Sequence, residues 1–251
     1  MLNSKNIAIA VVIFLATFYQ TVWAGPPFVT DDAEPVEAQH WEINNAVITG
    51  VSRGDTTVGA PVIDINYGLS PDVQLHLQPS LMYENNSAHK HFGIDDTEIG
   101  VKYRFIDHRD DESEWMASIY PILTLPTADK TFNDGHRNIQ TFLPLWIQRN
   151  SKDWTIYGGA GYRIDQGLDK KNSYFTGITA LNHVSDHLQL GGELFHETAT
   201  EIGGKATAGF NLGGIYDFSG RYHLLLSAGK GLINASSTNQ LSTYLALQVT
   251  Y

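Results

Sequence analysis

Hydrophobic and polar residues alternate along most of this chain, and the final segment shows the pattern most clearly. One face of an extended strand would carry Leu241, Thr243, Leu245, Leu247, Val249 and Tyr251. The intervening positions carry Ser242, Tyr244, Ala246, Gln248 and Thr250. Because side chains in a strand point alternately to opposite faces, this period of two predicts an amphipathic strand.

The same alternation, bounded by turn residues, recurs and predicts twelve strands of about ten to fifteen residues each. These segments are 40–50, 56–68, 72–84, 92–106, 113–125, 137–149, 153–165, 172–184, 187–197, 204–218, 222–229 and 240–251. An even number of antiparallel strands is typical of bacterial outer-membrane barrels. We therefore predict an all-β fold, a transmembrane antiparallel β-barrel of about twelve strands over residues 40–251, in the outer membrane of a Gram-negative bacterium.

Short and long connections alternate between these segments. Tight turns are expected at 70–71, 150–152, 185–186 and 219–221, with a somewhat longer one at 107–112; the longer connections are 51–55, 85–91, 126–136, 166–171, 198–203 and 230–239. In such barrels the short turns face the periplasm and the long loops face outward, which puts both termini in the periplasm.

Aromatic residues cluster at the predicted periplasmic strand ends, where amphipathic rings favour a membrane interface. These residues are Trp41, Tyr67, Phe105, Trp115, Trp154, Phe218, Tyr222 and Tyr251, and a smaller outer set is Tyr83, Phe92 and Tyr174. A soluble β-sandwich would alternate too, but it has no reason to sort aromatics by strand end.

Four prolines interrupt the predicted strands, and each would remove a hydrogen bond from the sheet. We therefore expect a bulge or an outer rim position at Pro61, Pro79, Pro121 and Pro144.

The N-terminal residues 1–24 have the features of a secretory signal peptide. Lys5 precedes the apolar run 7–18, and small residues suit cleavage after Ala24. The run is too short to span a bilayer as a helix, although an uncleaved anchor is the alternative. Cleavage leaves 227 residues for a single domain with no cysteine and a net charge of −12, which argues against a nucleic-acid partner. We expect membrane lipid and small-molecule solutes as partners, and no cofactor.

The inward face of the predicted barrel is charged. The expected lumen residues are Glu42, Asp64, Glu84, Asp96, Glu98, Lys102, Arg104, Arg163, Asp165, Glu193 and Asp217. Charged groups are costly on the lipid face, so their inward placement follows from the register. Two interpretations stay open: a passive, porin-like channel whose charges set selectivity, disfavouring anions, or a closed structural barrel filled with ion pairs.

Both ends of the predicted mature chain resemble known outer-membrane barrels. The segment 25–39 and the start of the first strand carry Gly25, Pro26, Pro27, Phe28, Thr30, Asp31, Asp32, Pro35, His40, Trp41 and Glu42. This opening resembles the outer-membrane family named for the meta-pathway of phenol degradation, whose members are described as transporters. The resemblance implies uptake of a hydrophobic or aromatic compound. The terminal strand ending on Tyr251 resembles the signal that the barrel assembly machinery reads.

The prolines of this opening keep residues 25–39 extended. The segment is therefore expected in the periplasm, either tucked into the mouth of the barrel or as a solvated tail.

Two weaker patterns suggest other chemistry. His183 and Ser185 resemble the His-x-Ser element of outer-membrane lipid hydrolases, but Asp186 follows where those families carry Asn, and the pair falls at a periplasmic turn. A lipid-modifying hydrolase is thus the alternative function. His89, His91, His187 and His196 could contribute to a metal site, but the spacing lacks a third ligand and loop polarity explains it as well. We predict neither catalysis nor a metal site.

Overall fold

The computed structural model describes residues 27–86, 90–110, 113–130, 132 and 138–251. The predicted signal peptide 1–24 lies outside these described residues, as do His89 and part of the predicted loop 126–136.

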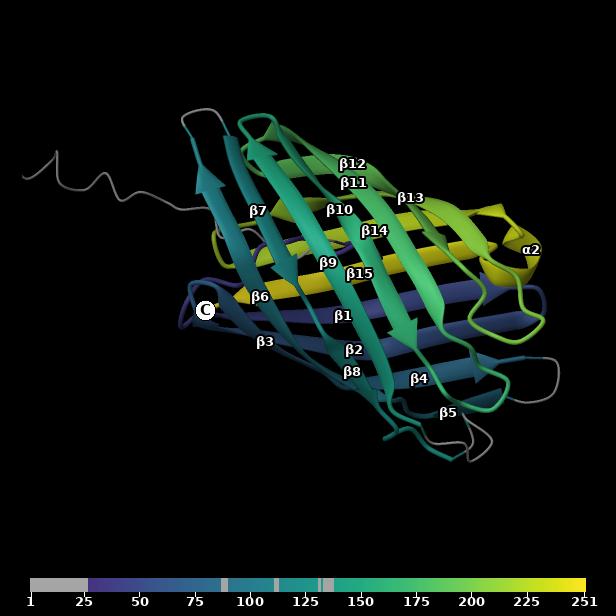
Figure 1. Ribbon diagram of the computed structural model, residues 1–251. Coiled ribbons are helices and arrows are strands. Elements are labelled where there is room, and N and C mark those ends of the chain that lie inside the picture. Colours follow the sequence, from purple (N-terminus) through teal and green to yellow (C-terminus); the bar gives the residue numbers. More distant parts are fainter. Residues whose placement is uncertain (1–26, 87–89, 111–112, 131, 133–137) are drawn as a thin grey trace, which may run out of the picture.

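The chain forms one closed antiparallel β-barrel of twelve crossings, as the sequence predicts (Figure 1). The barrel closes because β1 pairs with both β2 and β15. Nine crossings are single strands: β1 (Trp41–Ser52), β2 (Asp55–Ser70), β9 (Gln140–Ser151), β10 (Trp154–Ile164), β11 (Ser173–Ser185), β12 (Leu188–Glu197), β13 (Thr207–Asp217), β14 (Tyr222–Ile233) and β15 (Leu241–Thr250).

Three crossings are each broken into two strands. They are β3 (Val73–Gln78) with β4 (Ser80–Asn85), β5 (Lys90–Ile94) with β6 (Thr97–Arg109), and β7 (Ser113–Ile119) with β8 (Ile122–Leu125). The only helix among the described residues is the short α2 (Ala235–Thr238). No helix in the described part of the chain is long and apolar enough to cross a membrane.

The prolines explain most of these irregularities. Pro79 separates β3 from β4, Pro121 lies between β7 and β8, and Pro61 coincides with a register shift between β2 and β4. The expectation of a bulge or rim position at Pro144 is wrong, because this residue lies inside β9 in unbroken register with β10. On the other side of β9, Pro144 lies opposite the break between β7 and β8, where Tyr120 donates to its carbonyl oxygen. No neighbouring strand therefore requires the N–H group that proline lacks.

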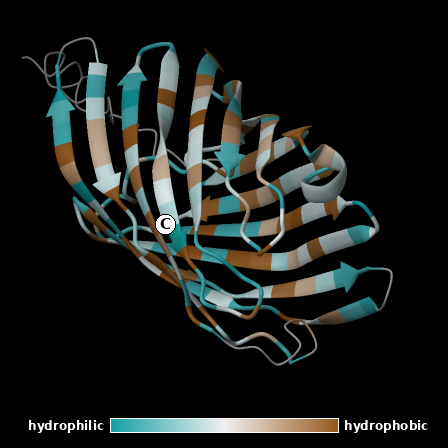
Figure 2. Ribbon diagram, turned by 45° about the vertical axis from the view of Figure 1, so that its right-hand side comes forward, coloured by the Kyte–Doolittle hydropathy of each residue, from teal (hydrophilic) through white to brown (hydrophobic). Residues whose placement is uncertain are grey.

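The alternation along β6 sets the two faces of the wall as predicted. Ile99, Val101, Tyr103 and Phe105 are exposed on the outer surface, whereas Lys102 and Arg104 are buried inside. Figure 2 shows the same banding of hydrophobic and hydrophilic residues on the other strands. The outer surface therefore forms an apolar belt, and the interior holds the polar residues.

The two ends of the barrel differ. The end at which β1 begins and β15 finishes, here called the turn end, carries the eight predicted aromatics; seven of their side chains are exposed and Tyr67 is half-buried against Trp41. The opposite end, here called the loop end, carries the longer connections. One of these was expected at 51–55, but β1 and β2 join through Arg53 and Gly54 alone, with Gly54 at a φ of 79°. Glycine adopts this left-handed conformation without strain.

Candidate functional site

The candidate site is the interior of the barrel, because residues 27–38, here called the lumen segment, lie inside it. The carboxylate of Glu193 on β12 accepts hydrogen bonds from the backbone N–H groups of Val29 and Thr30, both at 2.9 Å. The side-chain amide of Asn211 donates to the same carboxylate. Thr30 is fully buried. A carboxylate that accepts several N–H groups is a strong anchor for an extended backbone.

Side chains from three further strands hold the rest of the lumen segment. Gln148 on β9 accepts from the Ala33 N–H at 3.0 Å, and Gln74 on β3 accepts from the Val36 N–H at 2.8 Å. Ser227 on β14 donates to the carbonyl oxygen of Pro27. The sequence predicted that this segment lies in the periplasm, either tucked into the mouth of the barrel or as a solvated tail. In the structure, residues 27–38 lie within the lumen. The physical reason is that wall side chains supply the hydrogen bonds that an extended, proline-rich backbone cannot make to itself.

An ion-pair cluster fixes the middle of the segment. The Lys102 Nζ on β6 lies 2.9 Å from Asp32 and 3.3 Å from Asp31, and it is 5.1 Å from the centre of the Tyr120 ring. Lys102 is buried, and a buried ammonium requires nearby negative charge to offset its lost hydration. The segment therefore supplies the counter-charges for a wall residue.

Glu34 is a titratable group of the lumen segment with an altered pKa. Burial, together with the negative charges of Asp32 and Glu114, raises the pKa of the Glu34 carboxyl to about 7. Its carboxylate accepts a hydrogen bond from Gln148. The charge on the segment therefore changes near neutral pH.

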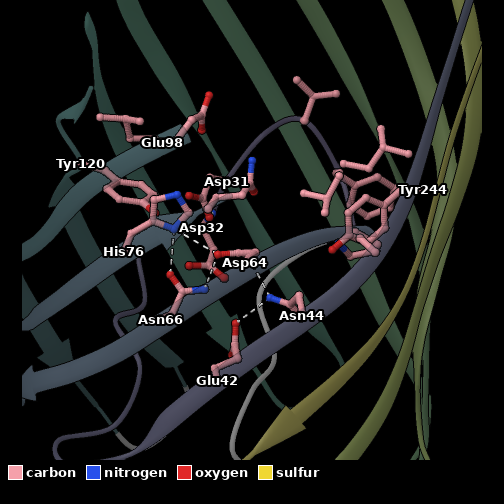
Figure 3. A pocket seen from close by; sticks show the side chains of 18 of the residues that line it. Asp31, Asp32, Glu42, Asn44, Asp64, Asn66, His76, Glu98, Tyr120 and Tyr244 are labelled. Carbon is pink, nitrogen blue, oxygen red and sulfur yellow. Dashed lines mark hydrogen bonds and ion pairs between the residues drawn. The ribbon is translucent and has the colours of Figure 1, made fainter. Parts of the chain in front are cut away.

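A second polar cluster lies on β1, β2 and β3 (Figure 3). The amide of Asn44 donates to Glu42 at 3.3 Å and to Asp64 at 3.1 Å. The His76 Nδ1 lies 3.0 Å from Asp64 and 3.1 Å from the Asn66 carbonyl oxygen. Both acidic residues thus belong to a connected hydrogen-bond network on the inner wall.

A cavity of about 340 Å³ separates the lumen segment from this wall. Four of the eleven predicted lumen residues line it: Glu42, Asp64, Glu98 and Lys102. Also on its surface are Asp31, Asp32 and Glu34 of the segment, and Tyr120 and Tyr244 of the wall. The cavity is therefore rich in acidic groups and has aromatic rings on its surface.

The other predicted lumen residues are spread along the barrel. Arg104 pairs with Asp72 and Asp107 near the turn end, where Asp217 also pairs with His223. Arg163 pairs with Glu197 towards the loop end. Further hydrogen bonds join Glu84 to Asn86, Asp96 to the Ala128 N–H, and Asp165 to the Gly167 N–H. None of these residues lines the cavity. Glu193, the remaining predicted lumen residue, does not line it either and anchors the lumen segment.

Sequence reasoning missed the amide and imidazole side chains that organise this interior. Gln74, Gln148, Asn44, Asn66 and His76 all lie at buried, inward positions of their strands. Their signal was present in the alternation, because each falls on the face opposite the apolar residues. Selecting only charged residues for the inward face left them out.

The residues of the alternative hydrolase site lie at a turn. The His183 Nε2 is 3.1 Å from the Thr155 hydroxyl, and its Nδ1 is 3.1 Å from the carbonyl oxygen of Lys152. The hydroxyl of Ser185 accepts from the His187 N–H at 3.3 Å. A nucleophilic serine requires a histidine within hydrogen-bond distance of its hydroxyl, and these contacts engage both ring nitrogens elsewhere.

The candidate metal histidines include His91, which packs edge-on against Phe132 at 4.5 Å between ring centres. In the described part of the chain, no three or more His, Cys, Asp or Glu side chains are grouped to hold a metal ion.

Comparison with known proteins identifies the family and the fold. Residues 24–248 match the family described as "Putative MetA-pathway of phenol degradation". No curated protein matches the sequence. An outer membrane channel from Pseudomonas putida F1 has a similar fold, with a TM-score of 0.67 and 15% identity over 88% of this chain and 98% of that chain.

Two porins share the fold more distantly. The NanC porin has a TM-score of 0.53 at 7% identity, and the KdgM porin 0.51 at 9%; each match covers 84% of this chain and 98% of the porin. The apolar belt and these similarities place the protein in the bacterial outer membrane. The chain is an outer-membrane β-barrel and belongs to the family described as the MetA-pathway of phenol degradation.

Proposed function

We propose that the protein is a passive channel for small solutes whose path is occupied by the lumen segment. One observation carries this proposal: a segment of chain lies inside the barrel, and side chains of the wall hold it by hydrogen bonds and ion pairs. Such contacts are reversible, and undocking of the segment would leave a polar passage through the barrel.

The charge of the lumen favours cations over anions. Acidic residues outnumber basic ones around the cavity, and charged rings in a narrow passage set ion preference. The family description supports a hydrophobic or aromatic cargo, and the aromatic rings of the cavity suit the apolar part of such a solute. The protein is not proposed to be an enzyme, because the contacts of His183 and Ser185 do not form a nucleophile and base pair.

Conductance in planar bilayers tests the channel. The mature chain is compared with a variant that lacks residues 25–38, and both are checked for heat-modifiable assembly. We expect small, intermittent currents from the full chain and larger, steady currents from the variant. Assembled barrels that conduct in neither form would support the closed structural barrel. Acyl-ester hydrolysis abolished by Ser185→Ala would instead support the lipid hydrolase.

A disulfide offers a reversible test of the lumen segment, because the chain has no cysteine of its own. A Cβ placed at Gly177 would lie 3.1 Å from the Thr30 Cβ, slightly below the spacing of about 3.5 to 4.5 Å that disulfides adopt. The oxidised Thr30→Cys/Gly177→Cys protein should conduct less than its reduced form. Equal conductance in both forms would show that solutes pass without movement of the segment.

We also propose that the turn end, where β1 begins and β15 finishes, faces the periplasm. An epitope inserted after Ile202, in the connection between β12 and β13, should be accessible to antibody on intact cells. An epitope inserted after Lys152, in the turn between β9 and β10, should not be. The reverse result would invert the orientation.

A further inference from the structure

The cavity beside the lumen segment contains a buried acceptor without a donor. Asn44 is only 3% exposed, and its Oδ1 has no hydrogen-bond partner among the described residues. The amide orientation is set by its surroundings, because its NH₂ group donates to the carboxylates of Glu42 and Asp64. The carbonyl oxygen therefore faces an environment that lacks donors, and a buried acceptor left in this state is costly.

His76 has a second unpartnered polar atom on the same wall. Its Nδ1 contacts two acceptors, Asp64 and the side-chain Oδ1 of Asn66, so this nitrogen carries a proton. The Nε2 has no partner in the described part of the chain; it accepts in the neutral ring and donates in the charged ring. Both residues line the cavity (Figure 3). The cavity wall thus contains two residues with a buried polar atom that lacks a partner.

The charge around the cavity also calls for a cation. Six carboxylates line it, against Lys102 and His76 as the basic groups: Asp31, Asp32, Glu34, Glu42, Asp64 and Glu98. Lys102 is already within 3.3 Å of both Asp31 and Asp32, so its charge is offset by the segment. His76 likewise lies 3.0 Å from Asp64. A positively charged occupant would add to these two cations and stabilise the ionised forms of the acidic side chains of the cavity.

Part of the cavity surface is apolar. This part includes Phe28, Val36, Ile48, Val62, Ile122 and the ring of Tyr244. Figure 3 shows Tyr120 and Tyr244 on opposite sides of the space, with the acidic residues between them. An occupant would therefore have a cationic head near Asn44 and Asp64 and an apolar body near Tyr244. Aromatic rings also attract organic cations through their faces.

We propose that this cavity binds a small organic cation, a primary ammonium or amidinium group attached to an apolar body. Such a group has N–H donors for the Asn44 carbonyl oxygen and positive charge for the carboxylates. A bare metal ion fits less well, because the described residues contain no group of three ligands arranged for one. The proposal rests on the proposed channel function and specifies the class of solute that binds in the lumen of the barrel.

Isothermal titration calorimetry on the full mature chain in detergent tests the proposal with three probes of one shape. Phenethylammonium carries the charge, phenethyl alcohol is its neutral counterpart and phenylacetate is the anion. We expect phenethylammonium to bind at least about tenfold more tightly than the alcohol, and phenylacetate to show no binding. Equal affinity for the cation and the alcohol, or no binding of the cation, would overturn the proposal.

Matched variants locate the site. Asp64→Asn removes a carboxylate of the cavity, and Asn44→Ala removes the unused acceptor while keeping every charge. Each should weaken phenethylammonium binding about tenfold or more. Asp217→Asn is the control, because Asp217 is a half-buried acid paired with His223 near the turn end and does not line the cavity. If Asp64→Asn and Asp217→Asn weaken binding equally, the cavity is not the site.

Failure of this proposal can be separated from failure of the channel function. A protein that conducts after deletion of residues 25–38 but does not distinguish the three probes remains a channel without this binding site. A protein that binds phenethylammonium selectively but never conducts retains the site without the channel.

Discussion

Replacing Glu193 with Gln should loosen the lumen segment without disturbing the barrel wall. The Glu193 carboxylate accepts three hydrogen bonds, from the Val29 and Thr30 N–H groups at 2.9 Å each and from the Asn211 amide. A glutamine keeps one accepting oxygen, but its NH₂ group would face an N–H group that donates to the Glu193 carboxylate in the native protein. One charge-assisted hydrogen bond is lost and the others are weakened.

The size of the effect follows from these contacts. A hydrogen bond to a charged group contributes about 1.5 to 3 kcal/mol. The variant should therefore lose about 2 to 3 kcal/mol of docking free energy, which shifts the ratio of undocked to docked segment by a factor of about 30 to 160.

Thiol labelling measures this ratio, because Thr30 is fully buried and the chain has no native cysteine. In a Thr30→Cys background, the labelling rate should report how often the segment leaves the lumen. Glu193→Gln should raise that rate by the factor given above. Glu197→Gln is the matched control, because Glu197 lies four residues further along β12 and pairs with Arg163 rather than with the segment.

Equal labelling rates in Glu193→Gln and Glu197→Gln would refute the argument that Glu193 anchors the segment. Fast labelling in the unmodified Thr30→Cys background would show that the segment is not stably docked at all. Heat-modifiability of every variant confirms that the barrel itself is assembled.

Three further predictions concern Glu34, Lys102 and Tyr251. Burial and neighbouring charges raise the pKa of Glu34 from 4.5 to about 7. Docking of the segment should therefore be strongest below pH 4.5 and weaken as the pH rises through 7, by up to about 3 kcal/mol. Conductance should rise over the same pH range, and Glu34→Gln should flatten this profile. Lys102→Gln removes the ammonium between Asp31 and Asp32, so reversal potentials in bilayers should move towards stronger cation preference; an unchanged potential would place the ion path elsewhere. Deleting Tyr251 removes its backbone hydrogen bonds to the first residue of β1 and the expected assembly signal, so the amount of heat-modifiable barrel in membranes should fall, and normal amounts would contradict this.

The breaks at Pro79 and Pro121 were expected, since a proline removes a ladder hydrogen bond in any sheet. The regular course of β9 through Pro144 was not. It depends on the neighbouring crossing, which is broken opposite that residue. The two-residue turn at Arg53 and Gly54 likewise depends on how far the pairing of β1 and β2 extends. Features set by a partner strand cannot be derived from one strand's own residues.

The sequence by itself determined the faces of the strands and the barrel class. The alternation of Ile99, Val101 and Tyr103 with Lys102 and Arg104 sets the outer and inner faces, because the period of a strand is a local property of the backbone. Only the tertiary structure decided which inward residues meet. Asp31, Asp64 and Lys102 come together because the barrel closes around the lumen segment, and that closure depends on pairing across the whole chain. Gln74 and Gln148 anchor the segment for the same reason: an inward amide becomes a site when a distant backbone N–H reaches it.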